Sequence, residues 1–154
     1  MTPTDGFVGV TGASGQLGML AAQALMNRVA PAKTVLLSRT PEKLSAFVQF
    51  GAQIRRCELV DKADLPRAFA GISTLLLISS DSLGRRVAQH EAAIRAAHEA
   101  GVKRIVYTSF LGAEPGNPAL VARDHCATEK MLRGSGVDWT ILRNAQYAEA
   151  VLDV

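Results

Sequence analysis

Short apolar runs alternate with longer amphipathic stretches along the whole chain, and this alternation constrains the fold more than any other feature. The apolar runs have the length and residue types of strands, and they span residues 7–11, 34–38, 53–57, 73–78, 104–108 and 138–142. Helices are predicted over 15–29, from Thr40 onward, and over 61–69, 83–100 and 120–133. Strict strand–helix alternation predicts a Rossmann-type α/β fold: a doubly wound parallel sheet of about six strands with helices on both faces.

Composition narrows the class of protein. The 154 residues suit one domain with its own core, because 48% are hydrophobic and 20% are charged. No apolar run is long enough to span a bilayer and no secretory signal pattern is found, so a cytoplasmic protein is expected. The net charge of +3 is mild and the basic residues form no stripe, which argues against nucleic-acid and membrane partners. Cys57 and Cys126 lack metal-ligand spacing, so free thiols and no metal site are predicted.

A glycine-rich segment, from Gly12 to Gly18, directly follows the first predicted strand and opens the first helix. Gly12 permits a tight turn, and Gly15 lets the backbone approach a pyrophosphate. Gly18 lets the helix pack closely against the strand. The unpaired N–H groups at the helix start would point at the anion. The segment therefore predicts a dinucleotide site; the alternative is a plain strand–helix turn, which the surrounding strand pattern disfavours.

The end of the second strand distinguishes NADP(H) from NAD(H). An acid there would accept a hydrogen bond from the ribose 2′-hydroxyl and repel a 2′-phosphate. The chain has Ser38, Arg39 and Thr40 instead. Arg39 can bind a 2′-phosphate through two N–H groups and stack on adenine, and Lys43 would add positive charge one turn later. We therefore predict NADP(H); an exposed arginine without a ligand is the alternative.

Two further strand ends point to the same crevice. Glu58 follows the third strand, where its side chain could reach the adenine edge or simply be solvated. Ile78, Ser79 and Ser80 end the fourth strand, at the edge where open α/β sheets bind ligands. Small residues at that point would let the cofactor ribose and nicotinamide pass close to the backbone.

Five segments together, residues 10–18, 75–80, 101–109, 125–132 and 142–147, resemble the NmrA-like family of atypical short-chain dehydrogenase/reductases. Within that family the chain is most similar to bacterial NADPH-dependent quinone oxidoreductases, and the resemblance covers almost the whole chain. It implies a Rossmann domain that binds NADP(H). In some members it implies hydride transfer to a quinone-like planar acceptor, and in others redox sensing without turnover.

The resemblance also implies residue roles. Those along the cofactor would be Gly12, Ser14, Gln16 and Leu17 at the pyrophosphate, Arg39 at the 2′-phosphate, and Ser79 and Ser80 along the ribose. Those around the reacting centre would be Tyr107, Thr108 and Ser109 near the nicotinamide, Lys130 as a cofactor or active-site lysine, and Asn144 and Tyr147 at the border of the substrate pocket.

The chain departs from the usual reductase pattern at its proton donor. Short-chain reductases commonly place a tyrosine four residues before an active-site lysine, but here Cys126 precedes Lys130 at that spacing. Quinone reduction needs a hydride donor and positioning more than a resident acid. Tyr107 and His125 are the other candidate donors, although core packing is favoured for Tyr107 and a surface position for His125.

The remaining polar and aromatic candidates receive structural interpretations. His90 and His98 lie on the predicted helix 83–100 and are interpreted as surface residues. Cys126 is interpreted as a small helix residue rather than a nucleophile, because no histidine–carboxylate set accompanies it. Trp139 is expected in the core or at an interface. Glu58 stands where typical family members carry aspartate.

The NmrA-like family continues well beyond the sixth strand, in a part that forms most of the substrate lid. Residues 1–154 are therefore expected to be a single NAD(P)-binding Rossmann domain without that C-terminal substrate-binding part. Three hypotheses follow: an NADPH-dependent quinone oxidoreductase, a non-catalytic NADP(H)-binding redox sensor, or an inactive truncated form. The sequence leaves open a homo-oligomer or a regulatory protein partner.

Overall fold

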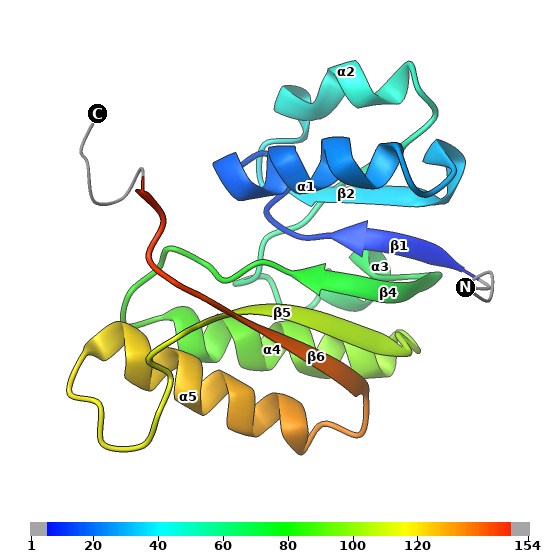
Figure 1. Cartoon of the computed structure of the whole chain (residues 1–154). Helices are drawn as coiled ribbons and strands as arrows, with labels where there is room; N and C mark the ends of the chain where they lie inside the picture. The colour runs from blue at the N-terminus through cyan, green and yellow to red at the C-terminus, as the bar shows by residue number, and fades with distance from the viewer. Residues whose placement is uncertain (1–5, 149–154) are drawn as a thin grey trace.

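The computed structural model describes residues 6–148, and its centre is a six-stranded sheet in which every pairing is parallel. The strands are β1 (Phe7–Val10), β2 (Thr34–Ser38), β3 (Gln53–Arg56), β4 (Ile72–Leu77), β5 (Arg104–Phe110) and β6 (Asp138–Asn144). Their spatial order is β3-β2-β1-β4-β5-β6 (Figure 1). The chain therefore winds outward from β1 in one direction and from β4 in the other, and the two directions separate between these strands.

Helices lie on both faces of the sheet, as predicted. One face carries α1 (Gln16–Met26) and α2 (Ser45–Val48), with the 3-10 turns η1 (Pro31–Lys33) and η2 (Pro41–Leu44). The other face carries α3 (Leu65–Ala68), α4 (Arg86–Glu99) and α5 (Leu120–Arg133) (Figure 1). The predicted doubly wound Rossmann-type fold is confirmed.

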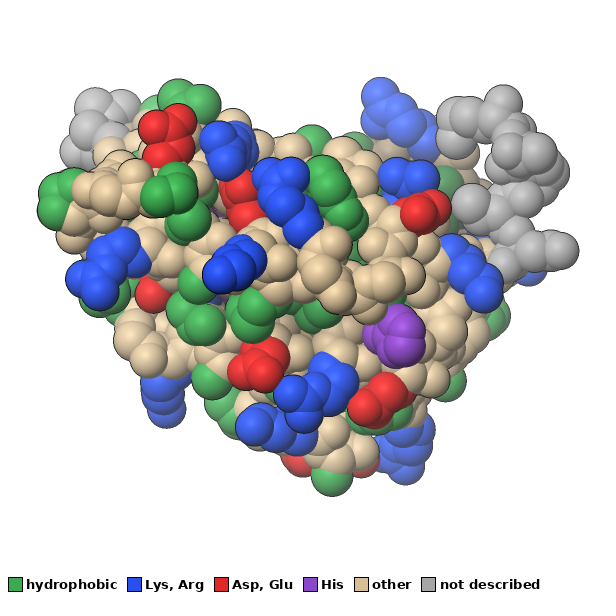
Figure 2. Space-filling model, turned by 90° about the horizontal axis from the view of Figure 1, so that it is seen from below, with side chains coloured by type: hydrophobic (Ala, Val, Ile, Leu, Met, Phe, Trp, Pro, Cys, Tyr) green, Lys and Arg blue, Asp and Glu red, His purple; other side chains and the backbone are tan. Residues whose placement is uncertain are grey.

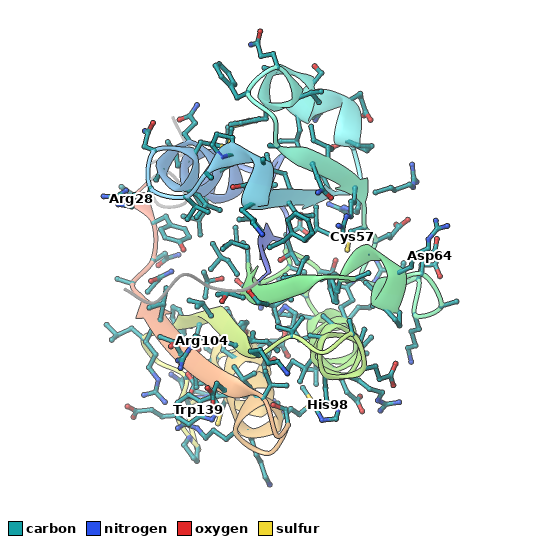
Figure 3. All side chains as sticks on the ribbon, turned by 90° about the vertical axis from the view of Figure 1, so that its right-hand side faces the viewer. Arg28, Cys57, Asp64, His98, Arg104 and Trp139 are labelled. Atoms are coloured by element: carbon teal, nitrogen blue, oxygen red, sulfur yellow. The ribbon has the colours of Figure 1, made fainter. Side chains whose placement is uncertain are left out.

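Two apolar clusters form the core, one on each face. The alternation of a strand divides its side chains between them, so Val35 and Leu37 of β2 join the larger cluster while Leu36 joins the smaller one. Cys57 belongs to the larger cluster, and burial, together with the charge of Glu58, raises the pKa of its thiol to about 12. Figure 3 shows Cys57 in the interior and His98 at the periphery. Cys57 is thus a structural, unreactive thiol.

The helix following β1 differs from its prediction in extent and in the face it buries. It ends at Met26 rather than at residue 29. Leu20, predicted on the buried face, is 64% exposed, whereas Gly18 and Ala22 are buried. The small residues face the sheet because the helix packs directly against the loop before it. Ala21 and Leu25, which the apolar periodicity also placed on the buried face, do pack against the smaller cluster, so the predicted face was correct in part.

The helices α2 and α3 are much shorter than predicted. The residues after Thr40 form a 3-10 turn followed by one turn of α-helix, and Thr40 makes no side-chain cap. The helix predicted from Asp61 begins at Leu65. Pro66 stands at its start and Gly71 follows with φ of 75°, so only one turn fits between these two residues.

The α1 side of the sheet is open beyond β4. In the part of the chain that is described, no helix covers β5 and β6 on that face, and Leu142 is 42% exposed there. A hollow of about 210 Å³ lies beside α1, and its lining is mostly apolar: Val8, Val10, Ala21, Ala24, Leu25, Arg28 and Leu76. The strand ends at the carboxyl edge are therefore reached from this side.

Candidate functional site

The loop between β1 and α1, residues 11–15, is a tight turn tied to both neighbouring strands. Gly12 has φ of 60°, a left-handed conformation that favours glycine. The Ala13 N–H donates to the Leu37 carbonyl at 3.1 Å, and the Thr11 N–H donates to the Leu76 carbonyl at 3.0 Å. The loop is therefore fixed between β2 and β4, at the point where the sheet order reverses.

The two glycines that follow have different functions. A Cβ at Gly18 would lie 2.1 Å from the Gly12 carbonyl oxygen, so only glycine allows the helix to approach the loop this closely. The predicted packing role of Gly18 is confirmed. Gly15 is exposed and has an ordinary φ of −79°, and its Cβ would meet only the Gly12 carbonyl oxygen, at 3.3 Å. The space above Gly15 is open to a ligand.

The start of α1 presents free amides to that space. Gln16, Leu17 and Gly18 open the helix, and their N–H groups have no backbone acceptor among residues 6–148, whereas Met19 N–H donates to Gly15 at 2.8 Å. No side chain caps the helix and no acid stands in its first turn. These donors, together with the positive end of the helix dipole, form a site for an anion such as a diphosphate.

Hydroxyl groups join the loop to the end of β2. Ser14 Oγ lies 2.6 Å from Ser38 Oγ and 3.1 Å from Thr40 Oγ1, and the Thr40 N–H donates to Ser38 Oγ at 3.0 Å. We call Ser14, Ser38 and Thr40 the hydroxyl cluster. Arg39 and Lys43 stand beside it, exposed, and neither forms an ion pair within the described part of the chain. Two free cations thus lie next to the open amides.

Glu58 lies beyond the end of β3, next to β2. It follows Cys57, whose N–H donates to the Ser38 carbonyl at 2.9 Å, and its side chain is half-buried. Glu58 therefore lies at the carboxyl edge near the end of β2, and its predicted contact with the adenine edge stays a prediction.

The end of β4 borders the loop on its other side. Ile78 is the neighbour that a Cβ on Gly12 would meet, at 3.8 Å, and the Ile78 N–H donates to Thr11 Oγ1 at 3.0 Å. The Ser79 N–H donates to Thr108 Oγ1 at 2.8 Å. Ser80 Oγ is buried and has no hydrogen-bond partner among the described residues. Ile78, Ser79 and Thr108 are thus brought together at the edge where they were predicted.

Tyr107 is not at this edge. It is fully buried under α4 and α5, where its hydroxyl lies 2.6 Å from His125 Nδ1 and 3.4 Å from His90 Nδ1. Burial raises the pKa of the Tyr107 hydroxyl above its usual value. The catalytic role predicted for Tyr107 is therefore wrong, because alternation along β5 turns its side chain away from the crevice.

The predicted surface positions of two histidines are also wrong. His90 and His125 are 0% and 5% exposed, and both rings pack against Tyr107. Burial, followed by the charge of Arg86, lowers the pKa of His125 to about 4. Burial and the charges of His125 and Arg86 lower the pKa of His90 to about 3. Both rings are therefore neutral at physiological pH, whereas His98 is exposed as predicted.

Ser109 is likewise directed into the protein. Its hydroxyl donates to Glu129 Oε1 at 2.6 Å, and Arg143 of β6 binds both oxygens of the same carboxylate, at 2.9 and 2.8 Å. Burial would raise the pKa of Glu129, but hydrogen bonds from Arg143, Ser109 and Arg133 outweigh it and lower the pKa. The hydroxyl of Ser109, which was predicted near the nicotinamide, joins α5 to the strand ends and does not point into the crevice.

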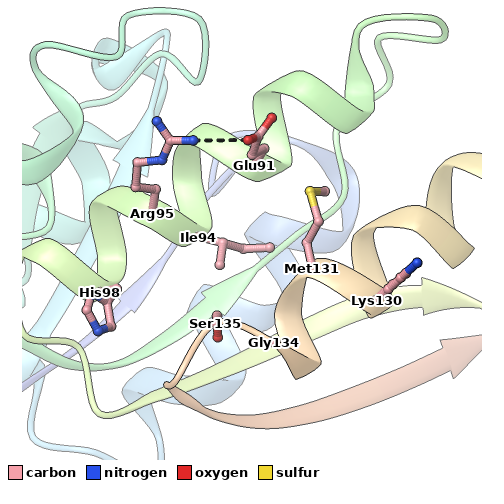
Figure 4. Close-up of a pocket in the computed structure, with 8 residues that line it drawn as sticks. All are labelled: Glu91, Ile94, Arg95, His98, Lys130, Met131, Gly134 and Ser135. Carbon is pink, nitrogen blue, oxygen red and sulfur yellow. Dashed lines mark hydrogen bonds and ion pairs between the residues drawn. The ribbon is translucent and has the colours of Figure 1, made fainter.

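Lys130 lies far from the strand ends, so the structure contradicts its predicted role as a cofactor or active-site lysine. It lines a groove of about 480 Å³ between α4 and α5. Figure 4 shows Lys130 and Met131 of α5 opposite Glu91 and Arg95 of α4. Figure 2, which views the molecule from this side, shows charges of both signs around apolar side chains. Glu129, the residue before Lys130, faces the sheet instead, because successive side chains of an α-helix differ in direction by about 100°.

Asn144 and Tyr147 lie together after the last strand. Asn144 ends β6, and its Nδ2 donates to the Tyr147 hydroxyl at 2.8 Å. Tyr147 is 46% exposed. Both residues are therefore accessible beyond the carboxyl edge, and their place at the border of a substrate pocket stays a prediction. Trp139, predicted in the core or at an interface, is 39% exposed and packs under the Arg133 guanidinium at 4.6 Å.

Sequence reasoning missed the polar residues of α4 and α5 that face the sheet. Arg86 and His90 are four residues apart on α4, and His125 and Glu129 repeat that spacing on α5. A polar stripe at this spacing was the available signal, because residues at i and i+4 share one helix face. Within residues 6–148 no cluster of metal-binding side chains occurs and no helix is long and apolar enough to cross a membrane.

The sequence matches a family profile described as NAD(P)H-binding over residues 12–150. It is 43% identical to quinone oxidoreductase 2 of Escherichia coli, over 94% of this chain and 50% of that protein. It is 32% identical to an NmrA-like family domain-containing oxidoreductase of Aspergillus flavus, over 91% of this chain and 48% of that protein. The chain spans about half the length of these curated relatives.

A solved structure shows that the similarity extends to the three-dimensional fold. The NADPH complex of an NADPH-dependent quinone oxidoreductase from Escherichia coli superposes with a TM-score of 0.89 at 42% identity. The match covers 96% of this chain and 52% of that one. The resemblance to NmrA-like reductases is thus confirmed in sequence and in fold.

Proposed function

Because the chain belongs to the NAD(P)H-binding family, we propose that it binds NADPH at the carboxyl edge of the sheet and transfers hydride to a quinone-like acceptor. The observation that carries the proposal is the set of free amides at the start of α1, above Gly15. A diphosphate would accept from Gln16, Leu17 and Gly18 N–H, which have no other acceptor within residues 6–148. The absence of an acid from the first turn of α1 removes the charge that would repel it.

The adenine end of the dinucleotide would lie over β2. Arg39 supplies an exposed guanidinium for the 2′-phosphate, and Lys43 adds a second positive charge. The hydroxyl cluster lies beside them and offers donors to the same phosphate. No acid stands at the end of β2 to accept from a free 2′-hydroxyl, so NADPH is favoured over NADH.

The nicotinamide end would lie over β4, on the other side of the loop, beside Ile78, Ser79 and Thr108. NADPH supplies a hydride when bound, and a quinone that takes this hydride and one proton becomes a hydroquinone. Tyr107 and Lys130 cannot provide the proton from where they lie. Tyr147 can, since its hydroxyl oxygen accepts from Asn144 and leaves its own proton free to donate. The protein's main contribution would be to orient the two reactants.

A non-catalytic sensor of NADP(H) is the second candidate. The observation that favours it is the lack of a tyrosine–lysine pair at the strand ends: Cys126 holds the tyrosine position and Lys130 faces the groove between α4 and α5. Such a protein would keep the amides and Arg39 but would not oxidise NADPH.

A combined binding and turnover measurement on the purified chain separates these proposals. NADPH fluorescence should report saturable binding that is tighter than NADH binding, and adding a simple benzoquinone should cause NADPH oxidation. Tyr147→Phe should lower kcat and leave the NADPH dissociation constant unchanged. Binding without oxidation would favour the sensor, and the loss of both would contradict the NADPH site itself.

A further inference from the structure

Both backbone polar groups of Ser80 are bound by buried side chains of α4. The Ser80 N–H donates to His90 Nε2 at 3.1 Å, and the Ser80 carbonyl accepts from Arg86 Nε at 2.6 Å. His90 is 0% and Arg86 is 7% exposed. The start of the connection between β4 and α4 is thus held by Arg86 and His90 of α4, which lie four positions apart.

These two side chains are in turn held by α5. Because His90 Nε2 accepts, the ring proton lies on Nδ1, which donates to Thr128 Oγ1 at 3.0 Å. Thr128 Oγ1 donates to the Asp124 carbonyl at 2.9 Å, and the Asp124 carboxylate lies 3.5 Å from Arg86 Nη1. His90 and Arg86 therefore have one orientation each, set by partners that do not reach the crevice.

The position of Ser80 gives this network a consequence for the ligand. In the strand order β3-β2-β1-β4-β5-β6, a dinucleotide centred on the β1 loop has one half over β2 and the other over β4. Ser79 is fixed from β5 through Thr108, so fixing Ser80 from α4 completes the placement of this strand end. The adenine side is fixed separately, by the hydroxyl cluster.

We propose that His90 and Arg86 are positioning residues for the nicotinamide half of the cofactor, acting through the backbone of Ser80. The proposal rests on the proposed NADPH site. It implies that disturbing the bond between His90 and Ser80 weakens binding of the whole dinucleotide but not of a ligand confined to the adenine side. A purely structural role would affect both ligands alike.

Two uncharged substitutions of His90 separate its two hydrogen bonds. His90→Asn keeps a donor at the Nδ1 position, toward Thr128, and loses the acceptor for Ser80. His90→Gln places an amide oxygen at the Nε2 position, so it keeps that acceptor and loses the donor toward Thr128. We expect His90→Asn to weaken NADPH about five- to tenfold, the effect of one lost hydrogen bond. His90→Gln should stay within about twofold of wild type, because the bond to Ser80 remains.

Adenosine 2′,5′-bisphosphate is the ligand that tests the location of the effect. It fills only the adenine side, so both variants should bind it as the wild type does. Equal weakening of NADPH and the bisphosphate by His90→Asn, or wild-type NADPH binding by that variant, would overturn the proposal. If the wild type failed to bind NADPH at all, the proposed function would fail instead.

A measurement on the wild-type chain covers the case in which the variants do not fold. The ¹⁵N resonances of His90 Nε2 and of the Ser80 amide should shift when NADPH is added and stay in place when the bisphosphate is added. Shifts of equal size with both ligands, or with neither, would overturn the proposal.

Discussion

Arg39 is exposed and has no ion-pair partner in the described chain, so its charge is available to a ligand. We expect Arg39→Ala to weaken NADPH on the order of tenfold or more, because a charge-assisted contact to phosphate is lost. NADH, which lacks the 2′-phosphate, should lose much less. Fluorescence titration with both cofactors measures this difference.

Arg28, an exposed arginine at the far end of α1, supplies the control for that substitution. Arg28→Ala should bind both cofactors as the wild type does. An equal loss of NADPH and NADH in Arg39→Ala would remove the 2′-phosphate assignment.

Single residues were predictable where the backbone position alone decides their role. The close packing of Gly18 follows from its place at a helix start, whereas the role of Arg39 at a strand end stays a prediction. Core packing was favoured for Tyr107 and the structure buries it, but the partners of its hydroxyl were not predictable. The burial of His90 was not predictable either, because it depends on which helix packs against which face. A polar residue on a helix gives no sign of the partners that allow it to be buried.

At the scale of the element, the turn from β1 into α1 contains two glycines that should respond differently to a side chain. Gly15→Val should keep the fold at a small cost in stability, because its φ of −79° suits valine while its Cβ would meet one backbone oxygen, at 3.3 Å. It should lose NADPH binding, because its side chain would fill the diphosphate position. Gly18→Ala should lower the unfolding midpoint instead, because its Cβ would lie 2.1 Å from a backbone oxygen.

Urea denaturation and NADPH titration of both variants measure the two effects separately. Gly134→Ala serves as the control for adding a methyl group, since Gly134 has φ of −91° and its Cβ would make only ordinary contacts, the nearest at 3.7 Å. Retained NADPH affinity in Gly15→Val would contradict the diphosphate assignment.

The Glu129 carboxylate connects α5 to β5 and β6, and its removal should loosen the last strand. Glu129→Gln leaves Arg143 with a neutral partner, and we expect a loss of about 2 kcal/mol in the free energy of unfolding. Glu91→Gln breaks an exposed pair with Arg95 on α4 and should cost about 0.5 kcal/mol or less. Denaturation curves of the two variants test the contrast, and equal effects would argue against Glu129 as a structural link.

The elements themselves were predicted well where their pattern was long. All the strands, α4 and α5 were expected close to their observed positions. The two helices have 14 residues each, so their pattern extends over several turns. The strands are shorter, and the alternation of strands and helices along the chain locates them. The extents of α2 and α3 were not predictable, since a few local residues, such as Pro66 and Gly71, decide where a one-turn helix begins and ends.

For the whole molecule, the two buried histidines make stability depend on pH. Their folded-state pKa values, about 3 for His90 and about 4 for His125, lie below the ordinary value of 6.5. Below pH 6.5 the unfolded chain therefore binds protons that the folded chain does not, so the folded state loses stability as the pH falls. We expect a loss of roughly 2 kcal/mol per histidine between pH 8 and pH 5.

Urea denaturation at pH 8 and pH 5 checks this dependence. His98→Gln, which removes an exposed histidine, should leave the difference between the two pH values unchanged, whereas His90→Gln should reduce it. Equal unfolding free energies at both pH values in the wild type would show that the two rings are not held neutral.

The molecular architecture was the most predictable level, because strand–helix alternation and right-handed crossovers leave few arrangements open. The layers of the fold and the reversal of strand order between β1 and β4 followed from this alternation. The packing of α4 and α5 against β5 did not, since it depends on hydrogen bonds between residues distant in sequence. The hydrogen bonds that Tyr107 makes to His90 and His125 were not predictable for that reason.

The hydroxyl cluster of Ser14, Ser38 and Thr40 also bears on how a dinucleotide is received. Hydrogen bonds already hold the loop to β2 on one side and to β4 on the other. The loop therefore loses little conformational entropy when a dinucleotide binds. The entropy lost on association is then mainly that of the dinucleotide, whose overall and internal rotations become restricted. A preformed binding site of this kind selects its ligand by shape and does not need to fold on binding.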